Sequence, residues 1–72
     1  MKQYKVVQFR SKDSFSNGYV TDGAKEYSMD YNIRGTHEKF LNMYAREGWK
    51  MVQVVPLGDM PHTHLIYFER DI

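Results

Sequence analysis

The clearest periodic pattern in the chain predicts one amphipathic helix that begins at Thr36. Thr36 is a suitable N-cap, because its hydroxyl can accept a hydrogen bond from an amide of the first turn. Gly48 can adopt the left-handed conformation that ends a helix, and Trp49 can then pack back on Tyr44. One helical face is formed by residues at three- and four-residue spacing, namely His37, Phe40, Leu41, Tyr44, Ala45 and Gly48.

Outside this helix the pattern changes to alternation and predicts three strands. Residues 4–9 form an aromatic and β-branched run with Val6 and Val7 on opposite faces. Residues 49–56 and 63–70 form the other two strands, and both faces of the strand at 49–56 carry apolar side chains, which suggests a covered strand or an interface. One face of that strand should hold Trp49, Met51, Gln53 and Val55, and the other Lys50, Val52 and Val54. The strand at 63–70 should place His64, Ile66 and Phe68 on one face and Leu65 and Tyr67 on the other.

The segment 10–35 shows no periodicity and is predicted to be a long ordered loop. It contains the turn dipeptides Asn17-Gly18 and Asp22-Gly23. It is too long for an ordinary connection in a compact domain and too rich in large side chains for a disordered linker. Its aromatic residues either cover the protein's own small core or form a surface for a partner.

These elements predict a single α+β domain over residues 1–72, in the order strand, long loop, helix, strand, strand. One helix would pack on a small three-stranded sheet, whose last two strands form an antiparallel hairpin through residues 56–61. A domain of 72 residues buries a limited share of its surface, and this one has no cysteine for disulfides. Because one helix covers only one face of the sheet, a second copy of the chain is the economical cover for the other face. We therefore predict a two-fold symmetric homodimer.

Charge and composition argue against several classes of function. The chain has 10 Lys and Arg against 9 Asp and Glu, and the two signs are intermixed. A dedicated polyanion-binding protein would show a basic stripe instead. No apolar run reaches the roughly twenty residues of a transmembrane helix, and no secretory signal begins the chain. We expect a cytoplasmic protein that makes no contact with a membrane.

No cluster of residues matches a catalytic or cofactor signature. The serines of the 10–35 segment have no neighbouring histidine, and the glycines fit no phosphate-binding loop. His62 and His64 could place two imidazoles on one side of a strand and bind a metal. Their possible further ligands, His37 and Asp59, lie elsewhere in the sequence, and ordinary surface histidines are the favoured interpretation. We expect a protein that is not an enzyme and holds no metal or cofactor.

The 10–35 segment is the strongest candidate for a binding surface. Its aromatic and basic residues combine the base stacking and phosphate contacts of single-strand nucleic-acid binders, but acidic residues among them nearly cancel the cations. We predict a surface that engages a host or phage protein, with weak nucleic-acid or nucleotide binding as the alternative. The candidate binding residues are Phe15, Tyr19, Tyr27, Tyr31 and Arg34.

Three runs of the sequence resemble a family of small bacterial and phage proteins of unknown function, DUF4177. They are Tyr4-Lys5-Val6-Val7, the run 44–56 with its Gly48-Trp49 pair and terminal Pro56, and Tyr67-Phe68-Glu69-Arg70. The whole chain is similar to the Yopt family, short prophage-type proteins from Bacillus, whereas the 10–35 segment aligns with nothing in DUF4177. The resemblance implies one helix and three strands per chain, a homodimer and a bacterial prophage setting. It carries over no catalytic or ligand residue.

Overall fold

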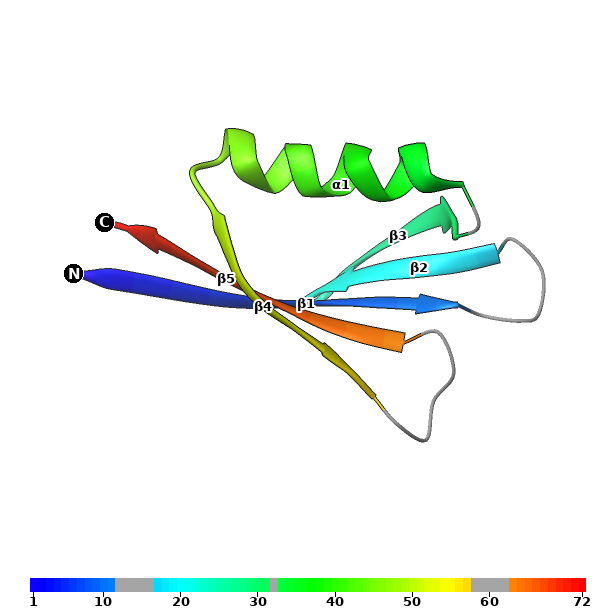
Figure 1. Cartoon of the computed structure of the whole chain (residues 1–72), viewed down its shortest axis with the longest axis horizontal. Helices are drawn as coiled ribbons and strands as arrows, with labels where there is room; N and C mark the ends of the chain where they lie inside the picture. The colour runs from blue at the N-terminus through cyan, green and yellow to red at the C-terminus, as the bar shows by residue number, and fades with distance from the viewer. Residues whose placement is uncertain (12–16, 32, 58–62) are drawn as a thin grey trace.

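The computed structural model of the chain shows one helix lying across one face of a five-stranded sheet (Figure 1). It describes residues 1–11, 17–31, 33–57 and 63–72. The elements are β1 (Lys2–Ser11), β2 (Asn17–Asp22), β3 (Lys25–Asp30), α1 (Arg34–Arg46), β4 (Lys50–Pro56) and β5 (Thr63–Asp71). The strand order is β3-β2-β1-β5-β4, and every neighbouring pair is antiparallel. No described element covers the second face of the sheet.

The predicted three-stranded sheet is wrong, because the 10–35 segment contributes two further strands. β2 and β3 form a hairpin that closes with Asp22 opposite Lys25. Its turn contains Gly23 with a φ of 62°, so the predicted Asp22-Gly23 turn is confirmed. β2 also pairs with β1, with Val20 opposite Phe9. The predicted loop is therefore an antiparallel hairpin that widens the sheet.

The predicted Asn17-Gly18 turn is also wrong, because both residues belong to β2. Gly18 is buried, and a Cβ atom there would lie 2.9 Å from the Arg10 carbonyl oxygen and 2.9 Å from the Tyr31 Cβ. Neither of those atoms is the free end of a flexible side chain. Glycine is therefore required here for close packing of Tyr31 against the strand.

The structure agrees better with the strands predicted at 4–9 and 63–70. β1 contains the whole predicted run 4–9, with Val7 buried and Val6 exposed on the opposite face. β5 shows the predicted alternation, with Ile66 and Phe68 buried. β4 and β5 pair antiparallel as the predicted hairpin, whose connecting residues 58–62 lie outside the described part of the chain.

A β-bulge changes the predicted faces of β4. Met51 is opposite Phe68 and Gln53 is opposite Tyr67, so Val52 is an extra residue between two successive positions of β5. Phe68 and Tyr67 point to opposite faces of the sheet, and the predicted placement of Met51 and Gln53 on one face is therefore wrong. The prediction failed because strict alternation cannot count an inserted residue.

The start of α1 differs from the prediction. The helix begins at Arg34, and the residue before it, Ile33, makes no side-chain capping hydrogen bond. Thr36 lies within the first turn, where its hydroxyl donates to the carbonyl oxygens of Ile33, at 2.8 Å, and Asp30. The predicted N-cap at Thr36 is therefore wrong, although its hydroxyl still fixes the entry to the helix.

The end of α1 is the predicted glycine C-cap. Gly48 has a φ of 89°. The Trp49 amide donates to the Tyr44 carbonyl oxygen and the Gly48 amide to the Ala45 carbonyl oxygen, each at 3.0 Å. These two bonds define a Schellman motif, which satisfies carbonyl groups that a helix end leaves unpaired.

The core lies between α1 and the sheet. Its aromatic rings meet at inclined angles, as in the edge-on contact of Phe9 with Phe40, whose centroids are 6.3 Å apart, and the tilted contact of Tyr44 with Phe68 at 5.1 Å. The buried apolar residues are Val7, Phe9, Val20, Met29, Phe40, Tyr44, Trp49, Ile66 and Phe68. β4 contributes none of these buried residues.

A polar cluster fixes the C-terminal half of α1 over β1 and β2. Asp22 Oδ2 accepts hydrogen bonds from the Tyr44 hydroxyl at 2.9 Å and from Lys5 Nζ at 3.1 Å. The Lys5 ammonium also lies 5.4 Å from the Tyr44 ring centroid and 5.1 Å from that of Trp49. Burial, assisted by the Asp22 carboxylate, raises the pKa of Tyr44 well above its ordinary value.

We expect Gly48→Val to lower the free energy of unfolding by about 1–3 kcal/mol, because a β-branched residue is strained at positive φ. Urea unfolding followed by circular dichroism measures this change. Gly35→Ala in α1 is the matched control, because Gly35 is helical and the nearest neighbouring atom would lie 4.0 Å from an added Cβ. It should be neutral or stabilising. Equal stability of Gly48→Val and the wild type would contradict the C-cap assignment.

We expect the stability of the wild type to fall as the pH rises above about 10, the ordinary pKa of tyrosine. Below that pH Tyr44 is protonated in both states, whereas above it the unfolded chain loses the proton and the fold retains it. Tyr44→Phe should therefore lose less stability between pH 9 and 11 than the wild type. At pH 7 it should cost about 1.5–3 kcal/mol, through loss of a hydrogen bond to a carboxylate.

Urea unfolding at each pH tests this expectation. Tyr4→Phe, which removes the hydroxyl of a residue that is 70% exposed, controls for loss of a phenol as such. Parallel pH profiles for Tyr44→Phe and the wild type would show that Tyr44 does not cause the alkaline loss.

Candidate functional site: a strand edge and an adjoining groove

The two edges of the sheet differ in their side-chain chemistry. The edge strand β3 carries Lys25, Glu26 and Asp30. The opposite edge strand, β4, is uncharged over residues 51–55, which we call the β4 edge. Charged side chains protect an edge strand against pairing with another chain, and an apolar edge lacks this protection. The exposed apolar residues on the β4 edge are Met51 at 50%, Val52 at 56% and Val54 at 44%.

The backbone of β4 is also open to a further strand. In an antiparallel pair, alternate residues direct their N–H and C=O groups towards the partner and the others direct them away. In the described part of the chain, the sheet neighbour of β4 is β5 alone. The outward groups of β4 are therefore available for β-sheet extension.

A groove with a volume of about 290 Å³ opens beside the β4 edge. Most of its lining is apolar, and Val54 belongs both to this groove and to the β4 edge. We call it the histidine groove, because two histidines from different elements meet there. Its lining residues are Phe9, Tyr31, His37, Leu41, Val54, His64 and Ile66.

The polar groups of the histidine groove are organised around Tyr31. His37 Nε2 lies 2.6 Å from the Tyr31 carbonyl oxygen, which can only accept, so this nitrogen carries the proton. The Tyr31 hydroxyl is hydrogen-bonded to His64 Nδ1 at 3.0 Å. The rings of Tyr31 and His37 meet nearly edge-on with centroids 4.9 Å apart. Burial raises the pKa of Tyr31, and its hydroxyl stays protonated at neutral pH.

The histidine groove brings together two of the histidines considered above as metal ligands. His37 and His64 both line it, whereas His62 and Asp59 lie outside the described residues. Within residues 1–11, 17–31, 33–57 and 63–72, no group of three or more His, Cys, Asp or Glu side chains could hold a metal ion. Each of the two imidazoles is instead hydrogen-bonded to Tyr31.

Two of the predicted binding residues face α1. The Tyr27 ring packs against Phe40 with centroids 5.7 Å apart, and Tyr27 and Tyr31 both lie against the core. Their rings cover the protein's own core, which is the first of the two interpretations of the 10–35 segment. Tyr31 is in addition part of the histidine groove.

The other predicted binding residues lie elsewhere. Tyr19 is opposite Arg10 on the face of the sheet away from α1, with the guanidinium carbon 5.7 Å from its ring centroid. Arg34 is exposed in the first turn of α1, and its Nε donates to Glu38 at 2.9 Å. Phe15 lies outside the described residues. The structure does not gather the predicted set into one surface.

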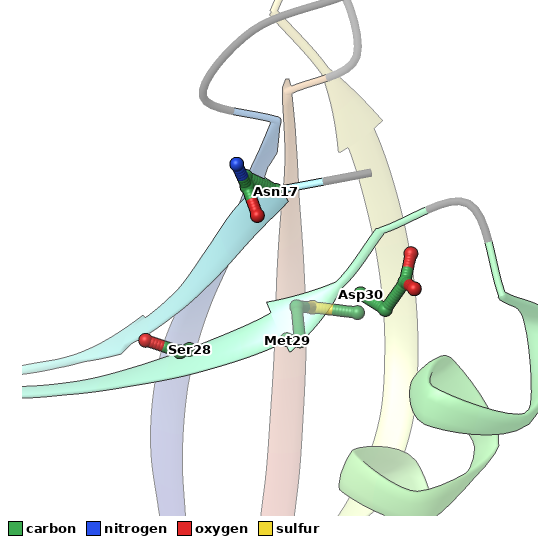
Figure 2. A pocket seen from close by; sticks show the side chains of 4 residues that line it. All are labelled: Asn17, Ser28, Met29 and Asp30. Carbon is green, nitrogen blue, oxygen red and sulfur yellow. The ribbon is translucent and has the colours of Figure 1, made fainter. Parts of the chain in front are cut away.

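A second hollow, with a volume of about 320 Å³, lies at the open end of the β2–β3 hairpin. Figure 2 shows the side chains of Ser28 and Asp30 pointing in opposite directions from β3. Ligand sites use polar groups that converge on one point, and the described side chains of this hollow lack that arrangement. Its lining residues are Asn17, Ser28, Met29 and Asp30.

The face of the sheet away from α1 is a further apolar surface, which we call the open face. Tyr4 is 70% exposed, Val6 45% and Tyr67 37%. Val6 and Tyr67 are directly opposite each other on β1 and β5. Across the described ranges, no helix combines the length and hydrophobicity that spanning a membrane requires.

Sequence reasoning missed the histidine groove and recognised the β4 edge only in part. The groove joins Phe9, Leu41 and Val54, which are far apart in the sequence and meet only in the folded chain. The apolar side chains on both faces of the strand at 49–56 indicated either a covered strand or an interface, and the structure places that strand at an edge of the sheet. The same residues form the uncharged run of the β4 edge.

A family model described as a domain of unknown function, DUF4177, matches residues 2–71. The chain belongs to the DUF4177 family. The DUF4177 match runs from the first residue of β1 to the last of β5, and so includes the 10–35 segment. Comparison with curated proteins and with solved structures finds no match. Membership of DUF4177 assigns no activity, and any functional proposal depends on the surfaces described above.

We expect Tyr27→Ala to lower the free energy of unfolding by about 2 kcal/mol or more, because it removes a ring packed against Phe40. Tyr19→Ala, on the opposite face, is the matched control and should cost less than about 1 kcal/mol. Thermal unfolding of both variants by differential scanning calorimetry makes the comparison. A larger loss for Tyr19→Ala would reverse the assignment of the two rings.

Proposed function

We propose that this DUF4177 protein is a non-enzymatic, cytoplasmic interaction module that works as a homodimer joined through its β4 edges. The observation that carries the proposal is the contrast between the charged edge at β3 and the uncharged, exposed edge at β4. A long apolar edge strand in a soluble monomer invites association with another strand. A second copy supplies such a strand with matching chemistry.

The β4 edge is complementary to itself in an antiparallel, two-fold arrangement. On the regular part of β4 that follows the bulge, pairing centred on Val54 would place Gln53 opposite Val55 of the second copy. The charged residue at the start of β4, Lys50, would then lie away from the two-fold axis and not opposite another lysine. Directly opposed like charges destabilise a strand pair, and this register avoids them.

The size of the chain supports the same conclusion. A 72-residue domain without cysteines depends on packing alone, and association adds buried apolar surface. Met51, Val52 and Val54 are each at least 44% exposed in the single chain. Pairing of the β4 edges would remove part of this surface from water. In a two-fold symmetric dimer, both copies would bury the same apolar surface.

The open face supports the second part of the proposal, binding of a host or phage protein by the dimer. Pairing at the β4 edge leaves Tyr4, Val6 and Tyr67 on the surface, and aromatic residues concentrate binding energy at interfaces. Resemblance to the Yopt family supports a prophage setting. Nucleic-acid binding has less support, because Tyr27 and Tyr31 pack against the core and do not form an open stacking platform.

We expect the wild type to sediment as a dimer and Val52→Lys to raise the dimer dissociation constant at least about 100-fold. An ammonium group in the apolar strip of the β4 edge would have to be desolvated without a partner. Analytical ultracentrifugation over a concentration series measures both constants, and circular dichroism confirms that the variant is folded.

Val6→Lys on the open face is the matched control and should remain dimeric, because Val6 is 45% exposed but lies away from the β4 edge. A dimer lost in Val6→Lys and kept in Val52→Lys would move the interface to the open face. A wild type that is monomeric at every concentration would refute the homodimer.

A further inference from the structure

We propose that the dimer joined at its β4 edges binds the apolar face of an amphipathic helix from a partner protein, with one helix to two chains. This inference rests on the proposed function, because the site is complete only when two copies pair through their β4 edges. The site lies on the face of the sheet that carries α1, and is therefore separate from the open face. It is built from the β4 edge and the histidine groove of both copies.

The symmetry of the dimer places both copies of α1 on the same side of one continuous sheet. A two-fold axis that pairs two identical strands antiparallel runs perpendicular to the sheet, and directly opposed residues then point to the same face. Val54 is opposite the buried Ile66 of β5, so its side chain lies on the α1 face. Pairing centred on Val54 would set the two valines side by side on that face. Because Val54 lines the histidine groove, the two grooves would meet at the two-fold axis.

The two grooves would join into one apolar trough between the two helices, which we call the dimer trough. Met51 is opposite the buried Phe68, so it also lies on the α1 face, where it is 50% exposed. Met51 and Val54 of both copies would form the floor, and Leu41 of each α1 would form a wall. Every residue of β4 except Val55 is exposed, so no described element covers this floor.

The dimensions of the dimer trough are those of one helix. Two adjacent strands make a strip about 10 Å wide, at ~4.8 Å for each strand. An α-helix with its side chains is about 10–12 Å across. With 7 residues, β4 is about 23 Å long at ~3.3 Å for each residue, which is the length of a helix of about 15 residues. A single helix on the two-fold axis gives the ratio of one helix to two chains.

Backbone hydrogen bonding favours a helix over an extended peptide in the dimer trough. Pairing of the β4 edges would use the outward N–H and C=O groups of β4, so the floor would offer no free strand edge. An extended peptide laid on this floor would bury backbone groups that have no partner, which costs free energy. A helix pairs its backbone groups internally and needs only apolar contact with the trough.

The chemistry of the histidine groove favours an apolar contact face on that helix. None of the residues that line the groove is Asp, Glu, Lys or Arg. Its polar side chains are engaged with one another, because His37 is hydrogen-bonded to the Tyr31 carbonyl oxygen and His64 to the Tyr31 hydroxyl. A charged group entering the trough would lose its hydration, whereas an apolar side chain would remove hydrocarbon surface from water.

Two synthetic peptides of about 15 residues test the proposal. Both contain the same numbers of Leu, Gln, Glu and Lys and have no net charge, but one has its leucines at three- and four-residue spacing and the other at alternating positions. Each is titrated into the full chain with labelled methyl groups, followed by NMR, at a concentration at which ultracentrifugation shows the dimer. We expect the helical peptide to shift the methyl signals of Leu41, Met51 and Val54 and to saturate at one peptide per two chains. It should bind at least about ten-fold more tightly than the alternating peptide.

The controls separate the dimer trough from the rest of the surface. The methyl signals of Val6 and Leu65, which lie on the open face, should not move. Leu41→Lys should weaken binding of the helical peptide at least about ten-fold and leave the dimer intact, because Leu41 lies in the wall of the trough and not on the β4 edge. Asn42→Lys adds the same charge at the adjacent, exposed position of α1 and should bind the peptide as the wild type does. Circular dichroism confirms that both variants are folded.

A dimer that binds neither peptide, or in which only Val6 and Leu65 shift, would overturn this proposal and leave the homodimer standing. Equal or tighter binding of the alternating peptide would show that the occupant is an extended chain. Shifts in the trough that grow with protein concentration alone, after the dimer is complete, would show that the occupant is another copy of the chain. A monomeric wild type would refute the homodimer and the dimer trough together.

Discussion

The pairing of β1 on both of its sides is the constraint on which the rest of the fold depends. β1 is the longest strand and lies at the centre of the sheet, between the β2–β3 hairpin and the β4–β5 hairpin. Phe9 illustrates the arrangement, because it is opposite Val20 on one side and His64 on the other. The inward side chains of both hairpins therefore lie on the same face of the sheet. Helix α1, which connects the two hairpins in sequence, covers that face (Figure 1). Each hairpin leaves its outer strand at an edge of the sheet.

The sequence predicted the elements in which apolar residues recur at regular spacing. It missed β2, in which packing requirements place glycine and aspartate at inward positions. β1, α1 and β5 have regular apolar spacing, and Gly48 carries a clear stop signal. In β2 the inward positions are Gly18, Val20 and Asp22, of which only the valine is apolar. Gly18 is small because Tyr31 packs against it, and Asp22 is polar because it binds Tyr44 and Lys5. These contacts exist only in the folded chain, and no local pattern reveals them.

The candidate site was predictable in the same unequal way. The uncharged run on β4 is visible in the sequence, and apolar side chains on both faces of the strand indicate either a covered strand or an interface. The bulge at Val52 is invisible to an alternating pattern, yet it decides which side chains face α1. The histidine groove needs α1, β1, β4 and β5 in place together. The sequence marked His37 and His64 as possible metal ligands. Their hydrogen bonds to Tyr31 form only in the folded chain and could not be predicted from the sequence.

Val54 has a double position, as a wall of the histidine groove and as a member of the β4 edge. Two binding events that contact one side chain are thermodynamically coupled when either of them alters its packing. The coupling is reciprocal, so a ligand that strengthens strand pairing is itself held more tightly by the same factor in the paired state. Occupation of the histidine groove and the proposed pairing of the β4 edges would therefore act on the same valine.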